Sequence, residues 1–277
     1  MAVSRIPYID RPSVAEFQDA FLKRQRPCVI RGGMKEWAAV ERWSDDAYLR
    51  EKVGNHVVSV TKTVGKDRLF VDEESSVVEM TVAEFLDIRH DDDADTKYFL
   101  MQRSLKENLA PLVDDMRTPE YVDESRLLLV NFWYCPGTNK TPLHCDWAAN
   151  IVCQVTGSKR FVLFPPGAEV YPHPHKANFS QVDLEAPDLE RFPRFDPSLR
   201  LEVDLQPGEM LHVPGLWYHQ VYSQANIAVN WWWWPRGAAL ARTFLTKQFL
   251  TYAARHGRDK LTQRVFGKKE HAGVGGA

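Results

Sequence analysis

The pattern of apolar and polar positions changes near residue 127. Beyond it, apolar runs of strand length are separated by Pro, Gly and Asp, which is typical of a β-rich region. The runs are Leu127–Tyr134, Asn150–Val155, Lys159–Phe164, Leu201–Leu205, Glu209–Val213 and Ile227–Trp234. The triplet at 156–158, Thr-Gly-Ser, has the length and the glycine of a short turn, so it predicts that the second and third runs form a hairpin.

The first 126 residues mix helical and strand patterns. An S-x-x-E at 13–16 and a T-x-x-E at 81–84 have capping-box spacing and predict helices that run to about residues 24 and 88. Ser44 predicts the N-cap of a helix that runs to Gly54. Strands are predicted at Arg26–Gly33, Val57–Thr63 and Lys97–Arg103, and a helix or irregular turn at Leu105–Met116.

Two further segments depart from the strand pattern. Ala168–Pro197 is rich in Pro, Asp and His and predicts a long irregular insertion over the β core. From residue 236 the pattern predicts helices at 238–256 and 259–266, and residues 236–277 carry nine Lys and Arg against two acidic residues, a net +7. We therefore predict three regions: 1–126 supporting the core, 127–235 forming it, and 236–277 as a basic helical segment for dimerisation or substrate binding.

Composition narrows the class of protein without naming a function. The 277 residues are 44% hydrophobic with a formal net charge of −2, and the aromatic content of 12%, including nine Trp, suits a β-rich barrel or sandwich. No apolar run is long enough to cross a bilayer, and the N-terminus has no apolar signal-peptide segment. The four cysteines have no paired spacing. These features predict an intracellular protein, cytoplasmic or nuclear, with reduced thiols.

A candidate metal site begins at His144 and Asp146. In an extended segment residues i and i+2 point to the same face, so both side chains can reach one ion. A third ligand must come from elsewhere, and His212 and His219 compete for it. His212 sits inside an apolar run, where a core histidine is expected, whereas His219 follows an aromatic pair after a Pro-Gly turn. With His219, the set becomes the two-histidine, one-carboxylate triad of non-haem Fe(II) oxygenases.

Four polar residues near these histidines are candidates for binding a co-substrate. Lys159 is either an exposed strand lysine or an inward cation for the distal carboxylate of a dicarboxylate. Thr141 either donates its hydroxyl to that carboxylate or caps a turn. Asn150 and Asn230 lie in apolar strands, where an unpaired amide is costly, so each satisfies a buried backbone group or lines a polar cavity. We favour the cavity.

Several ordered motifs resemble one known family. T-P-L-H-C-D-x-x-x-N-x-x-x-Q-x-x-G-x-K-R-x-x-L-F-P-P, then L-x-P-G-E-x-L-H-V-P-x-x-W-Y-H-x-V, then V-N-W-W are similar to the JmjC (cupin-like) Fe(II)/2-oxoglutarate oxygenases. The resemblance covers residues 127–235 and implies a mainly β fold, with a double-stranded β-helix (jelly-roll) core, flanking helices and C-terminal helices. It implies cofactors Fe(II) and 2-oxoglutarate, iron at His144, Asp146 and His219, 2-oxoglutarate at Thr141 and Lys159, and Asn150 and Asn230 in the cavity. Many relatives also touch 2-oxoglutarate with a tyrosine, for which Tyr98 and Phe99 are the nearest positions.

The resemblance implies a dioxygenase of the small hydroxylase branch, coupling decarboxylation of 2-oxoglutarate to hydroxylation of a substrate C–H bond. A wybutosine-type modified base in tRNA is one substrate class, supported by the basic segment at 236–277. A protein side chain is the alternative, and a non-catalytic cupin scaffold is a third hypothesis. A homodimer through the C-terminal helices is expected with either substrate, and no membrane partner is expected.

Overall fold

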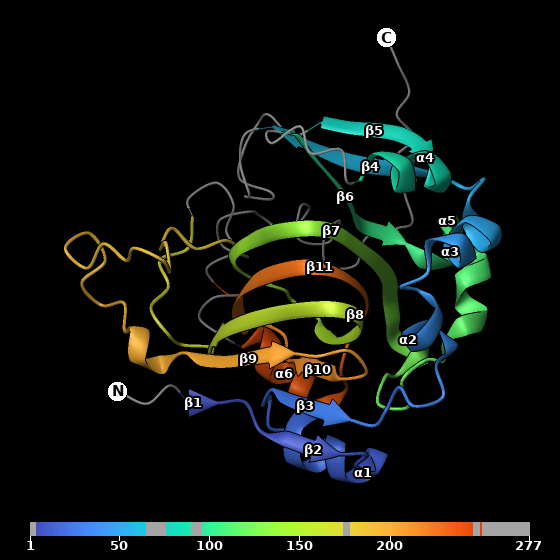
Figure 1. The fold of residues 1–277 in the computed structure, drawn as a ribbon. Coiled ribbons are helices and arrows are strands. Elements are labelled where there is room, and N and C mark those ends of the chain that lie inside the picture. Colours follow the sequence, from blue (N-terminus) through green and yellow to red (C-terminus); the bar gives the residue numbers. More distant parts are fainter. Residues whose placement is uncertain (1–3, 65–75, 90–95, 174–177, 246–249, 251–277) are drawn as a thin grey trace.

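Three long strands form the centre of the protein. The computed structural model describes residues 4–64, 76–89, 96–173, 178–245 and 250. The long strands are β7 (Leu127–Cys145), β8 (Ala149–Phe164) and β11 (Tyr218–Trp233). β11 lies between the other two and pairs antiparallel with both. All three curl strongly in Figure 1, so each contributes to two facing layers of a β core.

A bend in β8 replaces the predicted hairpin turn. Gly157 has a φ of +63°, and a Cβ at this position would lie 1.9 Å from the carbonyl oxygen of Ala225 on β11. The chain passes through residues 156–158 as one continuous strand, so the hairpin prediction is wrong. The glycine does mark a change in chain direction. The register between β8 and β11 shifts opposite this glycine, so the two paired strands bend together and neither strand ends there.

The predicted strands at 127–134 and 227–234 are each one part of a longer strand. β7 continues through Pro136 and Gly137, which usually end strands. These two residues lie opposite a register shift between β7 and β11, where the missing N–H of proline interrupts no regular ladder bond. β11 likewise begins at Tyr218, well before the predicted start.

Shorter strands extend the sheet on both sides of the long ones. The order β2-β3-β10-β8-β11-β7-β6-β4-β5 runs through the whole sheet, and β9 pairs with β8 and β1. The short strands are β1 (Ser4–Arg5), β2 (Tyr8–Asp10), β3 (Cys28–Arg31), β4 (Val57–Val64), β5 (Ser76–Thr81), β6 (Thr96–Ser104), β9 (Leu201–Leu205) and β10 (Met210–Val213). The expected mainly β, jelly-roll fold with flanking helices is confirmed, and strands from the first 126 residues are hydrogen-bonded into the same sheet.

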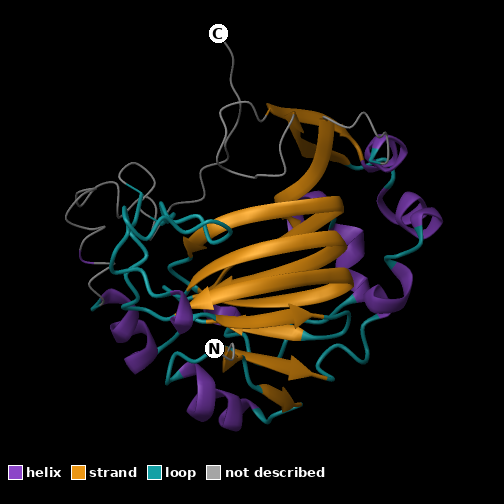
Figure 2. Cartoon of the chain, turned by 60° about the vertical axis from the view of Figure 1, so that its left-hand side comes forward, coloured by secondary structure: helices purple, strands orange, loops and turns teal. Residues whose placement is uncertain are grey.

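Short helices surround the sheet (Figure 2). They are α1 (Val14–Phe17), which continues as a π-helical turn at Gln18–Leu22, α2 (Ala38–Arg42), α3 (Asp46–Val53), α4 (Val82–Ile88), α5 (Leu105–Asn108) and α6 (Gly237–Phe244), with 3-10 turns at Ala110–Asp115, Glu124–Arg126 and Pro197–Leu199. Both predicted capping boxes form. The N-cap of α3 is Asp45 and not Ser44, because the Asp45 carboxylate accepts from the N–H of Ala47.

Three predictions fall partly or wholly outside the described residues. α6 covers the start of the helix predicted at 238–256, and most of the remainder is not described. The second C-terminal helix, at 259–266, is outside the described ranges, and so are residues 174–177 of the insertion predicted at 168–197. Among the described residues, none of the helices has the length and apolar character needed to cross a membrane.

Large aromatic side chains join the N-terminal helices to the long strands. Trp37 packs on Trp231 with ring centroids 5.5 Å apart, and Trp43 packs on Phe132 at 5.6 Å. The indole of Trp43 also donates to buried Asp115 at 2.9 Å, so this polar group in the core is satisfied. These contacts cover the outer face of β7 and β11 and leave their inner face free to line a pocket.

The insertion predicted at 168–197 is irregular and contacts the end of β7. Cys145 of β7 donates its N–H to the carbonyl of Asn178 in the insertion at 2.8 Å. In return, Ser180 of the insertion donates its N–H to the carbonyl of Leu143 of β7 at 2.8 Å. The ring of Phe179 stacks on His144, with centroids 5.4 Å apart. The insertion therefore forms a wall beside the end of β7.

We expect Gly157→Ala to destabilise the protein by about 3 kcal/mol or more, because alanine would need both a left-handed φ and room occupied by backbone. Urea denaturation measures this change. Gly137→Ala is the matched control, since an added Cβ at Gly137 meets nothing within 4 Å, and it should change stability by less than about 1 kcal/mol. Equal stability of the two variants would contradict the assignment of Gly157 to an obligatory bend.

Candidate active site

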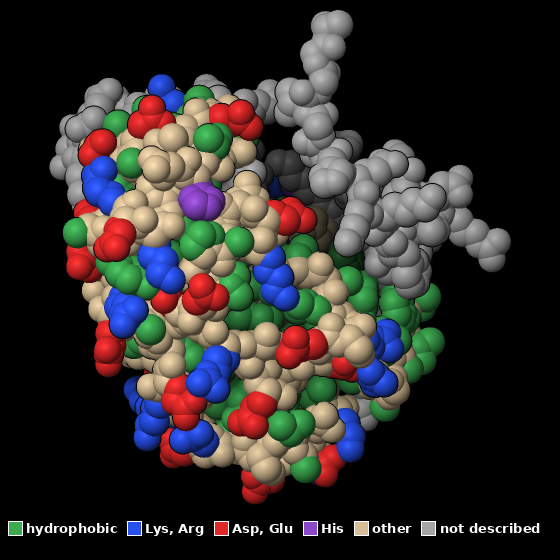
Figure 3. Space-filling view, turned by 90° about the vertical axis from the view of Figure 1, so that its right-hand side faces the viewer, with side chains coloured by type: hydrophobic (Ala, Val, Ile, Leu, Met, Phe, Trp, Pro, Cys, Tyr) green, Lys and Arg blue, Asp and Glu red, His purple; other side chains and the backbone are tan. Residues whose placement is uncertain are grey.

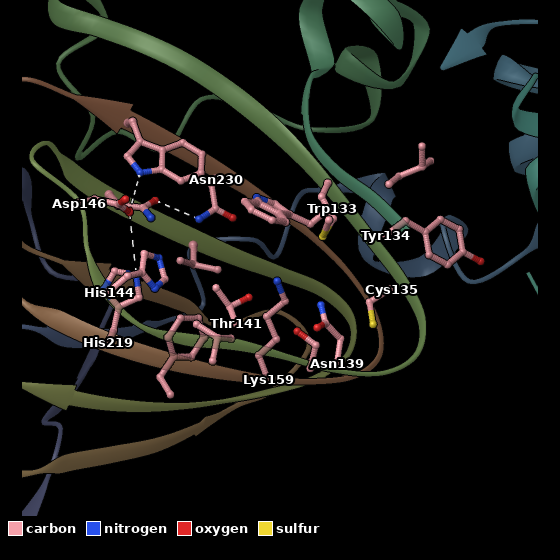
Figure 4. A pocket seen from close by; sticks show the side chains of 18 residues that line it. Trp133, Tyr134, Cys135, Asn139, Thr141, His144, Asp146, Lys159, His219 and Asn230 are labelled. Atoms are coloured by element: carbon pink, nitrogen blue, oxygen red, sulfur yellow. Dashed lines mark hydrogen bonds and ion pairs between the residues drawn. The ribbon is translucent and has the colours of Figure 1, made fainter. Parts of the chain in front are cut away.

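A pocket opens between the two layers of the β core, with an empty volume of about 660 Å³ that includes its open mouth (Figure 4). Its polar and aromatic lining comprises Trp133, Tyr134, Asn139, Thr141, His144, Asp146, Asn150, Lys159, Phe161, His219, Ser223, Asn230 and Trp232. All seven site residues predicted from the sequence are in this set. The fold therefore brings together side chains that lie far apart along the chain.

Two imidazoles and a carboxylate meet at one end of the pocket. His144 and His219 are direct cross-strand partners on β7 and β11, with ring centroids 4.3 Å apart. Asp146 follows the end of β7, and its Oδ2 lies 3.9 Å from Nε2 of His219. One ligand atom from each of the three lies within 4.8 Å of the others. This is a possible metal site.

Backbone carbonyls orient both imidazoles. Nδ1 of His144 contacts the carbonyl of Pro142 at 2.8 Å, and Nδ1 of His219 contacts the carbonyl of Trp217 at 3.0 Å. Because a carbonyl can only accept, Nδ1 of each ring carries a proton, and in the neutral form of the ring Nε2 keeps its lone pair. Burial, and then the neighbouring His144, lower the pKa of His219 to about 4, so its ring is neutral at neutral pH. Neutral imidazole is the form that binds a metal ion.

The donor set fits a first-row divalent ion. Two imidazole nitrogens and one carboxylate oxygen are the ligands of the non-haem Fe(II) triad, which leaves coordination positions open. Manganese, cobalt and nickel ions accept the same donors. Asp146 is additionally held by the indole of Trp232, whose Nε1 donates to Oδ2 at 3.1 Å.

Lys159 stands at the other end of the pocket (Figure 4). Its side chain is 7% exposed, and its Nζ lies 5.3 Å from the ring centre of Trp133. Burial lowers the pKa of Lys159 to about 8, and no acidic side chain of the described residues acts to raise it again. A buried ammonium group without an acidic partner is costly, and it indicates an anionic ligand.

Polar atoms without protein partners surround this ammonium group. The register places Ser223 opposite both Asn139 on β7 and Lys159 on β8. Oδ1 of Asn139 and Nε1 of Trp133 are buried and have no hydrogen-bond partner within the described protein. Thr141 lies two residues beyond Asn139 on the same face of β7 and points into the pocket (Figure 4). The donors among these groups, Nζ of Lys159, Nε1 of Trp133 and the hydroxyl of Thr141, fit a small bound carboxylate.

Asn150 and Asn230 pair with each other between the two ends of the pocket. Nδ2 of Asn230 donates to Oδ1 of Asn150 at 3.2 Å, and both amides are buried. Oδ1 of Asn230 has no partner within the described protein. Both asparagines line the cavity, so the polar-cavity alternative describes their position.

The two competing histidines occupy different environments. His212 is fully buried, its Nδ1 contacts the carbonyl of Arg26 at 3.1 Å, and its ring packs edge-on against Phe17 at 5.0 Å. Burial lowers the pKa of His212 to about 4. It therefore packs as a neutral core histidine, away from the group formed by His144 and His219.

The expected aromatic contact from β6 is not made by either candidate. Tyr98 and Phe99 are both absent from the described lining of the pocket, to which β6 contributes Leu100 and Met101. Phe99 packs with Met101 and Cys135, both of which line the pocket.

Sequence reasoning missed Trp133, Asn139 and Trp232. Asn139 could have been found, because it precedes Thr141 by two residues and so shares its face of a strand. Pro136 and Gly137 hid this relation by suggesting that the strand ends before Asn139. Trp232 belongs to the predicted strand Ile227–Trp234, but the strand pattern alone gives it no role. It faces the opposite way from Trp231 and Trp233, which lie in the core, and lines the pocket.

We expect Lys159→Met to stabilise the ligand-free protein at pH 7. The folded-state pKa of Lys159, about 8, lies below the ordinary value of 10.5, so folding opposes protonation. The unfolded chain then binds more protons between these values, and the stability of the parent rises with pH across that window. The advantage of Lys159→Met should be of the order of 2–4 kcal/mol below pH 8 and fade towards pH 10.5. Urea denaturation at pH 7 and pH 10 measures it; an advantage that is absent at pH 7, or that grows with pH, would contradict it.

Comparison with known proteins agrees with this geometry. Residues 14–238 match the family model described as "Cupin-like domain". The chain is 34% identical over 242 residues to "Lysine-specific demethylase 8" of Danio rerio, covering 82% of this chain and 58% of that protein. It is 29% identical over 265 residues to human "Bifunctional peptidase and (3S)-lysyl hydroxylase JMJD7", covering 82% of this chain and 84% of that protein.

A tRNA-modifying relative is also similar. The chain is 25% identical over 247 residues to "tRNA wybutosine-synthesizing protein 5" of Gallus gallus, covering 83% of this chain and 77% of that protein. The chain spans between 52% and 59% of the length of the demethylase and JmjC relatives from frog, zebrafish and fly. With the family model matched over most of its length, the chain belongs to the cupin-like JmjC domain family.

Proposed function

We propose that the protein is an Fe(II)- and 2-oxoglutarate-dependent hydroxylase. One observation carries the proposal: the same pocket has an open two-histidine, one-carboxylate group at one end and, at the other, a buried lysine that has no acidic partner among the described residues. A metal ligand set alone would serve many purposes. A dicarboxylate that reaches from the metal to Lys159 accounts for both ends at once.

Each residue has a defined part in this proposal. His144, Asp146 and His219 would hold Fe(II), which supplies, with 2-oxoglutarate and dioxygen, the oxidising power needed to hydroxylate a C–H bond. Lys159 pairs with the distal carboxylate of 2-oxoglutarate, and Thr141 donates its hydroxyl to the same group. Asn150 and Asn230 present amide groups to the middle of the pocket, where they orient what is bound.

The surroundings of the pocket support a reactive site. Val152, Phe161 and Val221 provide apolar walls between its polar groups. Exclusion of water strengthens the attraction between Lys159 and a carboxylate, because the effective dielectric constant is low. The same exclusion protects reactive species from side reactions.

For the substrate, we propose first a modified base in tRNA. The similarity to a relative named for tRNA wybutosine synthesis and the net charge of +7 over residues 236–277 support it. On the described surface that carries α3 and α4, basic and acidic side chains alternate without a large patch of one sign (Figure 3). Arg50 with Asp87, and Arg89 with Asp46, form ion pairs there. A phosphate-binding surface would therefore have to lie elsewhere, and the basic segment is the candidate.

A protein side chain is the second candidate substrate. The relative named as a lysyl hydroxylase is matched over 84% of its length, so the likeness extends well beyond the metal motif. The described part of the insertion also lies beside the metal ligands, where Phe179 stacks on His144. It could contact a peptide at the mouth of the pocket.

The test is succinate formation from 2-oxoglutarate with Fe(II), measured with bulk tRNA or with a peptide pool. We expect turnover in the parent and loss of more than about 100-fold in His144→Ala, because the variant lacks a metal ligand. Lys159→Ala should raise the KM for 2-oxoglutarate by at least about 10-fold, since a buried charge-assisted contact is lost. Lys23→Ala, at a side chain that is 61% exposed, is the matched control and should behave as the parent.

The two substrate classes give different outcomes. Stimulation by tRNA alone, lost on charge reversal of Lys260, Arg264, Lys268 and Lys269, would support the tRNA proposal. Stimulation by peptides alone would move the protein to the side-chain hydroxylases. No turnover with either substrate, and none without substrate, would contradict the enzyme proposal and favour a non-catalytic cupin.

A further inference from the structure

We propose that Trp232 is a positioning residue for the metal site, which acts by holding the carboxylate of Asp146. The inference rests on the proposed metal site and adds to it a side chain that does not itself bind the metal. It follows from an asymmetry in how the three ligands are held.

The two histidines are oriented by backbone, whereas the carboxylate is not. His144 and His219 each lie in a strand, with Nδ1 fixed by a carbonyl within 3.0 Å. Asp146 lies just beyond the end of β7, and its side chain is 30% exposed. In the described part of the chain, the only hydrogen bond to this carboxylate comes from the indole of Trp232. Trp232 therefore takes the role for Asp146 that carbonyl groups take for the histidines.

The geometry of this bond determines which oxygen faces the other ligands. Trp232 donates to Oδ2, and the same oxygen is the one within 4.0 Å of Nε2 of His219. The terminal torsion of an aspartate is broad, so a carboxylate without a partner would sample many orientations. An indole N–H is only a donor, and a carboxylate oxygen is an acceptor for it. The bond thus keeps one chosen oxygen beside the imidazole nitrogens.

Trp232 is itself held in place by the strands. On β11 it pairs with Asn150 of β8 and Leu129 of β7, and its ring lies 6.4 Å from that of Trp133. Because Trp232 lies in the central strand, the position of its indole N–H is fixed by the sheet. A donor on a rigid strand can limit the carboxylate to binding through one oxygen, which leaves more metal positions open for other ligands.

Metal binding without 2-oxoglutarate or substrate isolates this role, because Trp232 also lines the pocket. The metal-free protein is titrated with Mn²⁺, and free Mn²⁺ is followed by electron paramagnetic resonance. We expect Trp232→Phe, which keeps an aromatic ring but removes the N–H, to weaken Mn²⁺ binding by about 10- to 100-fold. The visible absorption of bound Co²⁺ should also shift, since the carboxylate changes its mode of binding.

Trp234→Phe is the matched control. It makes the same substitution in a neighbouring, partly buried tryptophan, whose ring stacks on Phe244 at 5.7 Å and is not part of the pocket lining. This variant should bind Mn²⁺ as the parent does. Thermal unfolding of the metal-free proteins shows that both variants are folded.

A double-mutant comparison shows whether Trp232 acts through Asp146. In an Asp146→Ala background, Trp232→Phe should change the residual Mn²⁺ affinity by less than about 2-fold, because the carboxylate that it positions is gone. Parent-like Mn²⁺ binding by Trp232→Phe, or an equal loss in the Asp146→Ala background, would overturn the inference. If the parent itself bound no Mn²⁺ in a manner sensitive to His144→Ala, the proposed metal site would fail, and the inference with it.

Discussion

The pairing of β11 with both β7 and β8 is the constraint on which the rest of the structure depends. It sets His219 opposite His144 at one end and Ser223 opposite Asn139 and Lys159 at the other. Because side chains alternate between faces of a strand, a shift of one residue in this register would turn the whole polar set outwards. The tight approach of Gly157 to Ala225 prevents such a shift, since the bend in β8 and the irregularity in β11 fit at only one position.

The two faces of these long strands have opposite characters. The outer face packs against aromatic side chains of the N-terminal region, among them Trp37 and Trp43, and forms a dense apolar core. The inner face carries a lysine and several amides whose polar atoms lack partners within the described protein. Such groups oppose folding unless something satisfies them. The free energy gained by packing the outer core offsets this cost of burying unpaired polar groups. A ligand that forms hydrogen bonds with these groups would remove the cost.

The three proposed metal ligands are held in two ways. Backbone carbonyls accept from Nδ1 of both imidazoles and so orient Nε2 of each ring towards the proposed metal site, which is a property of strand geometry and needs no particular neighbour. The carboxylate of Asp146 lies outside regular structure and depends on a side chain, Trp232. The proposed hydroxylase therefore owes its ligand geometry partly to the sheet itself and partly to one indole on the inner face of the sheet.

The sequence alone was sufficient for the β-rich core and both capping boxes. It also predicted that His219, and not His212, lies beside His144 and Asp146, and that the seven candidate residues share one pocket. These rest on local signals: apolar periodicity, the i and i+2 relation, and the position of a histidine relative to turn residues. Only the tertiary structure decided that Gly157 bends a continuous strand, that β7 passes through Pro136 and so carries Asn139 on the same face as Thr141, and that Trp232 faces the pocket. A glycine or proline signals a change in backbone direction, but whether the strand ends there depends on a partner strand that bends with it. That partner, β11, comes from a distant part of the chain, and no local pattern contains it.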